Sequence, residues 1–347
     1  MKTKHLSYFL SLVFLLAIFV AAVYYNTSKP RVMILHSYNP GYAWTRDVDI
    51  GLGRVVDNWT GYSVTWHYMA TKQHSDPEWL RRSGIIARRA IERTNPKVLI
   101  AIDDLAQSLA AQYFVNDPNM EIVFAGVNGS IEPYGYPGAV NVTGIYERKQ
   151  LGAVRDAILA LENNKVPPDP HPKLIYVLDP SLSLEKDRAS IDAFAWAPIR
   201  YSGSIVAQTF DDWKKIILEK GPGADYIIVA NYRKLPVSES DPTYADPKEV
   251  MSWTDKNSKT PVVGIQSFNV EDGAMICIGV SPFEQGEVAA KMAQTILEKK
   301  IRANQIPIRT NNQCIVAIRE FSLAQRRMAL PAIYESFGRA TENYIEK

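Results

Sequence analysis

Residues 31–56 read RVMILHSYNPGYAWTRDVDIGLGRVV. The stretch opens with a short apolar run that contains β-branched residues, which is typical of a buried strand. A loop rich in Asn, Pro and Gly follows, and then apolar side chains recur at Val48, Leu52 and Val56, on one face of a helix. The stretch therefore predicts a strand followed by a helix, which is the repeating unit of an α/β fold.

The same alternation continues along the chain. Further strands are predicted in YSVTWHYM (62–69), KVLIAID (97–103) and EIVFAGV (121–127), with helices between them. A second series begins with a helix predicted over residues 147–161. Its strands are predicted in KLIYVLD (173–179), SIVAQTF (204–210), DYIIVAN (225–231), PVVGI (261–265), AMICIGV (274–280) and CIVAIRE (314–320). Strands this apolar predict parallel sheets covered by helices on both faces, and hence two Rossmann-like α/β lobes.

The N-terminal region carries a separate signal. Lys2 and Lys4 precede an apolar run over residues 9–25 that is interrupted only by Ser11. A positive segment followed by such a run predicts a secretory signal peptide or a membrane anchor over residues 1–28. In either case the lysines stay inside, and the rest of the chain is predicted to be exported.

Composition excludes several classes of function. The chain has 39 Lys plus Arg against 37 Asp plus Glu and no long basic block, which argues against a nucleic-acid partner. Cys277 and Cys314 lie in apolar runs and are predicted to be free thiols, and no pattern of Cys and His suggests a metal site. The sequence has no nucleophile elbow, P-loop or zinc-protease motif, so we expect no enzyme activity, cofactor or metal.

The candidate ligand site follows from the fold. In open parallel sheets, ligands bind at the carboxyl ends of the strands. The loops at those ends supply aromatic, hydroxyl, amide and carboxylate side chains, a mixture that suits a small polar solute. The predicted ligand-binding residues are Ser37, Tyr38, Trp44, Asp103, Asp104, Asn128, Asp179, Ser181, Asn231, Tyr232, Gln266 and Phe268.

Several of these residues have a structural alternative. Asp103 and Asp104 could pair with a ligand ammonium group or cap the helix that follows them. Asn128 and Asp179 could be turn residues, and Trp44 could pack its loop against the sheet. The combination of acids, aromatics and a helix N-terminus fits an amino acid with an aromatic or branched side chain, whereas a sugar would use the same aromatics and amides.

Several segments resemble a known family in their order and spacing. They are ILHSYNPGYAWTRDVDIGL (34–52), VLIAIDDLAQ (98–107), EIVFAGVN (121–128), NVTGIYE (141–147) and DGAMICIGVSPFEQGEVAAKMAQTILEKKIRANQIPI (272–308). These segments resemble the substrate-binding proteins of ABC-type transporters, in the group that includes tryptophan- and tyrosine-binding proteins. They are also similar to the extracellular sensing domains of some histidine kinases.

The resemblance implies the type I periplasmic-binding-protein fold, in which two lobes joined by a multi-strand hinge close on a ligand. It places lobe 1 in residues 30–144 plus 266–303 and lobe 2 in residues 145–265 plus 304–347, with crossovers near 143–146, 264–268 and 303–308. It implies an extracytoplasmic monomer that delivers a small solute to an ABC permease in the inner membrane. A membrane-tethered sensor that acts through a separate signalling protein is the alternative, and an α/β enzyme is a distant third.

Overall fold

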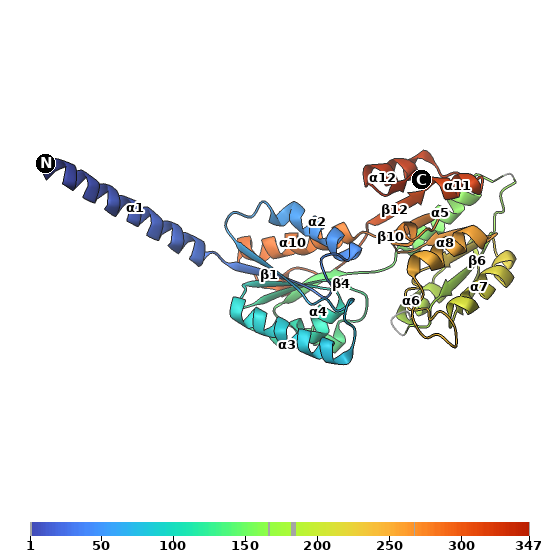
Figure 1. Cartoon of the computed structure of the whole chain (residues 1–347), viewed down its shortest axis with the longest axis horizontal. Coiled ribbons are helices and arrows are strands. Elements are labelled where there is room, and N and C mark those ends of the chain that lie inside the picture. The colour runs from blue at the N-terminus through green and yellow to red at the C-terminus, as the bar shows by residue number, and fades with distance from the viewer. Residues whose placement is uncertain (1, 166, 182–184, 267, 347) are drawn as a thin grey trace. The chain divides into compact units, whose positions relative to one another are not determined.

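The computed structural model describes residues 2–165, 167–181, 185–266 and 268–346. The chain divides into two compact units (Figure 1). The first unit is Met1–Glu147 with Pro282–Thr310, and the second is Arg148–Ser281 with Asn311–Lys347. Each unit is therefore built from two separate stretches of sequence.

The first unit is built around a six-stranded sheet with the order β11-β5-β4-β3-β1-β2. All of its strand pairs are parallel. The elements are α1 (Lys2–Ser28), β1 (Arg31–His36), α2 (Ala43–Val56), β2 (Ser63–Tyr68), α3 (Pro77–Thr94), β3 (Val98–Ile102), α4 (Asp104–Leu109), η1 (Ala111–Phe114), β4 (Glu121–Val127), η2 (Glu132–Tyr134), β5 (Val142–Tyr146), α10 (Pro282–Lys299), η5 (Ala303–Gln305) and β11 (Arg309–Thr310).

Both faces of this sheet are covered, as the apolar strands predicted. Helices α2 and α10 pack on one face, and α3 and α4 on the other (Figure 1). The contact between α2 and α10 depends on two glycines. A Cβ atom at Gly51 would lie 2.2 Å from the carbonyl oxygen of Phe283, and one at Gly286 would lie 2.1 Å from that of Val48. Gly51 and Gly286 therefore allow the close packing of α2 on α10.

The second unit contains a seven-stranded sheet with the order β13-β12-β10-β9-β8-β6-β7. One of its pairs, β10 with β12, is antiparallel. The elements are α5 (Leu151–Glu162), β6 (Lys173–Leu178), α6 (Glu185–Asp192), β7 (Arg200–Val206), α7 (Phe210–Glu219), η4 (Gly221–Gly223), β8 (Tyr226–Val229), α8 (Pro247–Asn257), β9 (Val262–Gly264), α9 (Phe268–Glu271), β10 (Ile276–Val280), β12 (Cys314–Arg319), α11 (Glu320–Gln325), α12 (Ala332–Ala340) and β13 (Tyr344–Ile345).

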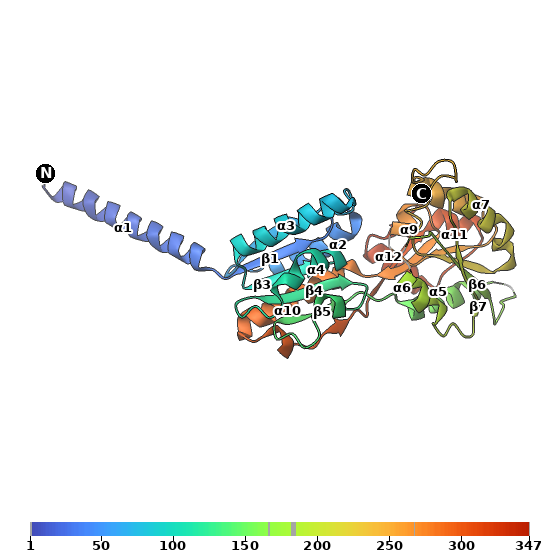
Figure 2. The ribbon, with the colours of Figure 1, turned by 90° about the horizontal axis from the view of Figure 1, so that it is seen from below.

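This sheet also lies between two apolar layers. Side chains of α5 pack on one face with Trp196 and Leu323, and side chains of α7 and α8 pack on the other around Trp213. Figure 2 shows β1, β3, β4 and β5 of the first unit lying side by side in the order that the hydrogen bonding gives. Asp76 and Asp246 cap α3 and α8 and are each followed by Pro at the first helical position, which explains where these helices begin.

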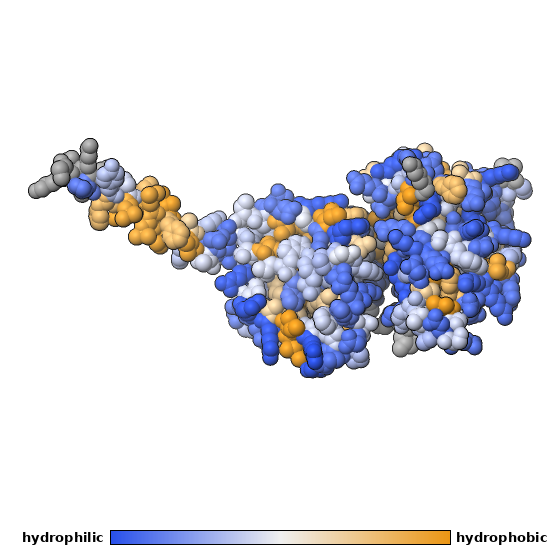
Figure 3. Space-filling model, in the orientation of Figure 1, coloured by the Kyte–Doolittle hydropathy of each residue, from blue (hydrophilic) through white to orange (hydrophobic). Residues whose placement is uncertain are grey.

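Helix α1 is apolar along most of its length (Figure 3). Its segment Tyr8–Ser28 has 21 residues and a mean hydropathy of 2.3, and it is not buried against the rest of the chain. A helix of this length and composition can cross a membrane, so the structure agrees with the signal or anchor predicted for residues 1–28.

The structure differs from the sequence-based expectation in several places. Residues 266–281, expected in the first lobe, lie in the second unit because β10 hydrogen bonds with β9 and β12. Strand β7 begins at Arg200 instead of residue 204, and α5 begins at Leu151 instead of residue 147. The chain passes between the units after Glu147, Ser281 and Thr310. The predicted helix over 184–195 begins outside the described residues, and its described part is Glu185–Asp192.

Candidate functional site

Asp103 is the most unusual predicted residue of the first unit. It follows β3 directly and has φ 68° and ψ 161°, a backbone conformation that residues other than glycine rarely adopt. Its N–H donates to the carbonyl of Ala125 over 2.9 Å, which ties it to the neighbouring strand. Its side chain is only 3% exposed. Strain of this kind persists where the surrounding structure enforces it, and it concentrates at ligand sites.

The carboxylate of Asp103 has one oxygen without a hydrogen bond. Trp44 donates its indole N–H to Oδ1 over 3.0 Å. Oδ2 is buried, and no partner for it exists among the residues that the structure describes. Since a buried carboxylate oxygen without a donor is costly, this atom is the strongest candidate for a group that pairs with a ligand cation.

Burial raises the pKa of Asp103 well above its usual value, and the negative charges of Glu147 and Asp104 raise it further. Lys72 and the hydrogen bond from Trp44 act in the opposite direction. A ligand ammonium group beside Asp103 would favour the ionised form and lower this pKa.

Asp104 has a different role from its neighbour. It is the first residue of α4, and both of its carboxylate oxygens are occupied. One accepts the backbone N–H of Asn128 over 3.1 Å, and the other accepts the hydroxyl of Tyr134 over 2.7 Å. The side chain of Asn128 donates to Glu147 over 3.1 Å. Asp104 thus connects α4 to the loop after β4, which is a structural role different from the helix cap that the sequence suggested.

Ser37 is fully buried and belongs to the framework of the site. Its hydroxyl donates to the carbonyl of Ile102 over 2.8 Å and accepts the N–H of Ala106 over 2.7 Å. Ser37 thereby fixes the start of α4 beside Asp103. Its side chain presents no surface to a ligand within the first unit.

Tyr38 and Trp44 are partly exposed and belong to an aromatic group at the same edge. The rings of Tyr38 and Tyr42 meet edge to face with centroids 5.3 Å apart. The ammonium group of Lys72 lies 4.8 Å from the first ring centroid and 5.6 Å from the second. These rings can cover an apolar part of a solute beside Asp103.

In the second unit, Asp179 holds its own loop together. Its carboxylate accepts the backbone N–H and the hydroxyl of Ser181 and, over 3.1 Å, the backbone N–H of Lys234. Its side chain is 1% exposed. Asp179 is thus a turn residue that links the ends of β6 and β8, and the structure gives it no free carboxylate oxygen.

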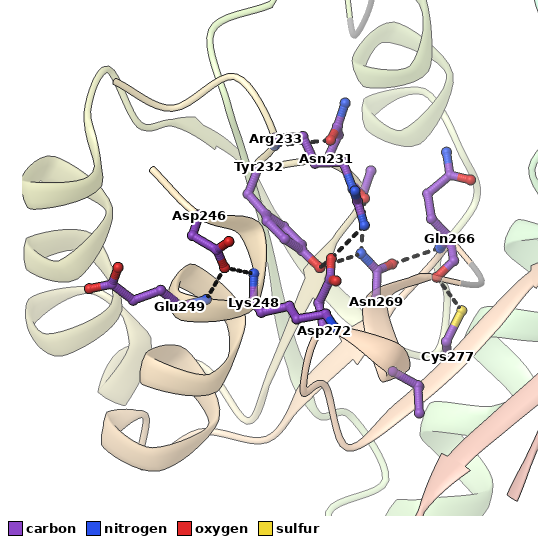
Figure 4. A network of polar contacts seen from close by, with 12 residues as sticks. Asn231, Tyr232, Arg233, Asp246, Lys248, Glu249, Gln266, Asn269, Asp272 and Cys277 are labelled. Carbon is purple, nitrogen blue, oxygen red and sulfur yellow. Dashed lines mark hydrogen bonds and ion pairs between the residues drawn. The ribbon is translucent and has the colours of Figure 1, made fainter. Parts of the chain in front are cut away.

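The loop after β8 contains a polar network (Figure 4). Tyr232 is fully buried and donates its hydroxyl to Asp272 over 2.8 Å. The hydroxyl also accepts the side-chain amide of Asn269 over 3.3 Å. Asn231 accepts the backbone N–H of Arg233 over 3.1 Å. Tyr232 is therefore a core residue, whereas Asn231 is partly exposed and shapes the turn.

Gln266 and Phe268 follow β9 and remain partly exposed. The backbone carbonyl of Gln266 accepts the thiol of Cys277 over 2.8 Å, and its backbone N–H donates to Asn269 over 2.8 Å. The guanidinium carbon of Arg233 lies 4.2 Å from the centroid of the Phe268 ring.

Sequence reasoning missed three charged groups at these edges: Lys72, Glu147 and Arg233. Each lies close to a predicted strand or site residue in the sequence, and none belongs to a recognisable motif. The position of Arg233 two residues after the predicted Asn231 was the only available signal. Glu147 was assigned to a predicted helix that begins four residues later in the structure.

The strand ends of the two units thus provide binding groups without an evident reaction centre. Among the described residues, no group of three or more His, Cys, Asp and Glu side chains could hold a metal ion. A separate open depression in the first unit, with a volume of 810 Å³, lies between α2 and the edge strand β2. Asp49, Trp66 and Tyr68 are among its lining residues, and none of the predicted ligand residues is.

One part of the chain matches a known family model. Residues 229–331 match the model described as ABC transporter substrate binding protein. The chain has no match among the curated proteins.

Solved structures are similar over most of the chain. A ligand-free, open substrate binding protein with adhesive properties from Clostridium difficile has 16% identity and a TM-score of 0.67, covering 92% of this chain and 99% of its own. An ABC domain from Streptococcus pneumoniae in complex with L-Trp has 14% identity and a TM-score of 0.60, over 89% and 98%. A carbohydrate transporter solute binding protein from Agrobacterium radiobacter in complex with D-arabinose has 10% identity and a TM-score of 0.54, over 89% and 99%.

Identities this low show a common fold and nothing finer. The fold is that of the type I periplasmic-binding proteins, as the resemblance in the sequence implied. Over residues 229–331, the family model agrees with the resemblance to ABC-transporter substrate-binding proteins that the sequence implied.

Proposed function

We propose that this chain is the extracytoplasmic substrate-binding protein of an ABC-type transporter and that its solute carries an amine, as an amino acid does. The observation that carries the proposal is the buried, strained Asp103, whose Oδ2 has no hydrogen-bond partner among the described residues. The ligand would be captured at the carboxyl end of the first sheet, where Asp103 lies.

The residues around Asp103 support an amino acid over a sugar. The buried Oδ2 of Asp103, which has no hydrogen-bond partner among the described residues, favours a cationic group on the solute. The rings of Tyr38 and Trp44 can cover an apolar side chain. The L-Trp complex among the similar structures is compatible with this class, and the D-arabinose complex gives the competing class.

The proposal is tested by calorimetric titration of the full chain, purified in detergent, with the twenty L-amino acids, D-ribose and D-arabinose. We expect saturable binding of at least one amino acid with one site per chain, and weaker or no binding of the sugars. If a sugar binds and no amino acid does, the solute class is wrong. If no member of the panel binds, the binding function itself is contradicted for these solutes.

A second candidate function is a membrane-tethered sensor that passes its signal to a separate protein. The observation that favours it is the length of α1. Its segment Tyr8–Ser28, with 21 residues and a mean hydropathy of 2.3, reaches the span of a membrane, whereas the apolar core of a cleaved signal peptide is about 7–15 residues long. Co-purification from membranes distinguishes the two functions, since a transporter component would bring a permease and a sensor would bring a signalling protein.

A further inference from the structure

Arg233 lies at the carboxyl edge of the second sheet, where ligand contacts are expected. It follows β8 (Tyr226–Val229) at the carboxyl end of the second sheet, so its backbone belongs to the set of loops that bind ligands in open parallel sheets. Its side chain is 33% exposed, whereas that of its partner Asp272 is 4% exposed. Arg233 is thus accessible at the edge while its anchor is buried.

The guanidinium group is held in a fixed orientation from two sides. Its Nη2 donates to Oδ2 of Asp272 over 2.8 Å, and the guanidinium carbon lies 4.2 Å from the ring centroid of Phe268. Asp272 is itself fixed, because the hydroxyl of Tyr232 donates to the same oxygen over 2.8 Å (Figure 4). An arginine fixed in this way loses little side-chain freedom when it binds a ligand.

Most donors of this arginine remain unused. A guanidinium group has five N–H donors, and the structure shows a side-chain hydrogen bond only from Nη2 among the described residues. The Nε atom is buried without any partner among those residues. A buried donor without a partner lowers stability unless something else satisfies it, so an acceptor is to be expected in the functional state.

We propose that Arg233 binds the carboxylate of the solute, with Asp272 and Phe268 holding its guanidinium in place. This inference rests on the proposed function and narrows it, because it makes the solute an α-amino acid or a similar zwitterion. The planar fork of an arginine matches a carboxylate through two parallel N–H···O bonds.

The test compares acids with their amides on the full chain in detergent. Wild-type protein is titrated calorimetrically with each of the twenty L-amino acids and with the corresponding carboxamides, which keep the amine and the side chain but lose the anionic charge. We expect the best-bound amino acid to bind at least about tenfold more tightly than its amide, since the amide loses a charge-assisted pair.

Variants assign the effect to this arginine. Arg233→Gln should weaken binding of that amino acid at least about tenfold and should reduce the preference for acid over amide to about twofold or less. Arg233→Lys keeps the charge but loses the planar fork. Its affinity for the amino acid should lie between those of Arg233→Gln and the wild type. The matched control is Arg200→Gln, because Arg200 is an exposed arginine of the same unit that pairs with Asp169 over 3.1 Å. It should bind as the wild type does.

Each remaining outcome has a definite meaning. Equal affinity of wild-type protein for acid and amide, or unchanged binding by Arg233→Gln, overturns the role of Arg233 and leaves the binding function standing. If Arg233→Gln does not fold, Arg233→Lys and the wild-type comparison decide in the same way. Binding of D-ribose or D-arabinose in place of any amino acid overturns the inference and the solute class together. If none of the tested solutes binds, the proposed function itself is contradicted for these solutes.

Discussion

Asp103 combines a strained backbone with a buried carboxylate that is only half satisfied, and this combination has a measurable consequence. We expect Asp103→Asn to weaken binding of an amine-bearing solute by about 1–3 kcal/mol, because the charged partner of the amine is lost. The same substitution should maintain or raise the melting temperature of the ligand-free protein, because it removes a buried charge close to Glu147 and Asp104. Calorimetry and thermal unfolding measure the two effects separately.

Asp104→Asn is the control for that substitution. Asp104 already accepts hydrogen bonds from Asn128 and Tyr134, so its replacement should lower stability by about 1 kcal/mol and change affinity less than Asp103→Asn does. Equal losses of affinity in the two variants would assign the amine-binding role to both acids. An unchanged affinity in Asp103→Asn would show that Asp103 does not pair with the solute.

The raised pKa of Asp103 also predicts a pH effect. In the folded, ligand-free protein burial raises the pKa above its usual 3.8, so the folded state holds the proton more tightly than the unfolded state. This contribution to stability is fully present below pH 3.8 and is lost as the pH rises through the folded-state pKa. Because a ligand ammonium group favours the ionised form, binding in that pH range should release a proton and tighten as the pH rises.

Calorimetric titrations in buffers of different ionisation enthalpy measure that proton directly. The release should disappear in Asp103→Asn, whose side chain does not titrate. Proton release that persists in this variant would place the titrating group elsewhere.

At the residue scale, the sequence indicated the place of the site better than the roles within it. Asp103 and Asp104 look equivalent in the sequence because both follow an apolar strand. Only the three-dimensional structure shows that the first is strained and half satisfied and that the second is fully bonded. Tyr232 was predicted as a ligand contact, but its position after β8 directs the side chain into the core. Arg233 was not predicted, since its partner Asp272 lies far away in the sequence.

At the scale of elements, the packing of α2 on α10 gives the clearest prediction. Gly51→Ala would place a methyl group 2.2 Å from a backbone oxygen of Phe283, which neither helix can accommodate without moving. We expect this substitution to destabilise the protein by at least about 2 kcal/mol. Gly152→Ala in α5 is the control, because nothing lies within 4 Å of its added atom, and it should be stabilising by about 0.5–1 kcal/mol.

Urea unfolding of the full chain in a single detergent checks both substitutions. A Gly51→Ala protein as stable as the wild type would mean that α2 and α10 do not pack at the distance described here.

Most elements were predictable because the strands are apolar and β-branched and the helices carry caps such as Asp76 and Asp246. The sheet to which a strand belongs, and whether it pairs parallel or antiparallel, could not be predicted. Strand β10 lies in the second sheet and pairs antiparallel with β12, which local pattern does not reveal. The start of β7 was also missed, since Arg200, Ser202 and Gly203 interrupt its apolar pattern.

At the scale of the whole molecule, α1 bears on where the protein is found. Its 21-residue segment Tyr8–Ser28 follows Lys2 and Lys4, carries Tyr24 and Tyr25 near its far end and precedes Lys29, an arrangement suited to a helix that stays in the membrane. We expect the full-length chain in the membrane fraction after alkaline extraction, with an intact N-terminus by mass spectrometry. A soluble mature form beginning at residue 23 would show instead that the segment is a cleaved signal.

The two-unit architecture was predictable from the repeated alternation of strands and helices, together with the order of the family-like segments. The roles of Asp103 and Arg233 were not predictable, because each depends on a contact with a distant residue of its own unit, Trp44 for Asp103 and Asp272 for Arg233.

The most direct test is a crystal structure of the full chain grown with the amino acid of the panel that binds most tightly. We expect the ammonium nitrogen of that amino acid within hydrogen-bond distance of Oδ2 of Asp103. A solute bound in the depression between α2 and β2, or one that leaves Asp103 without contact, would contradict this expectation.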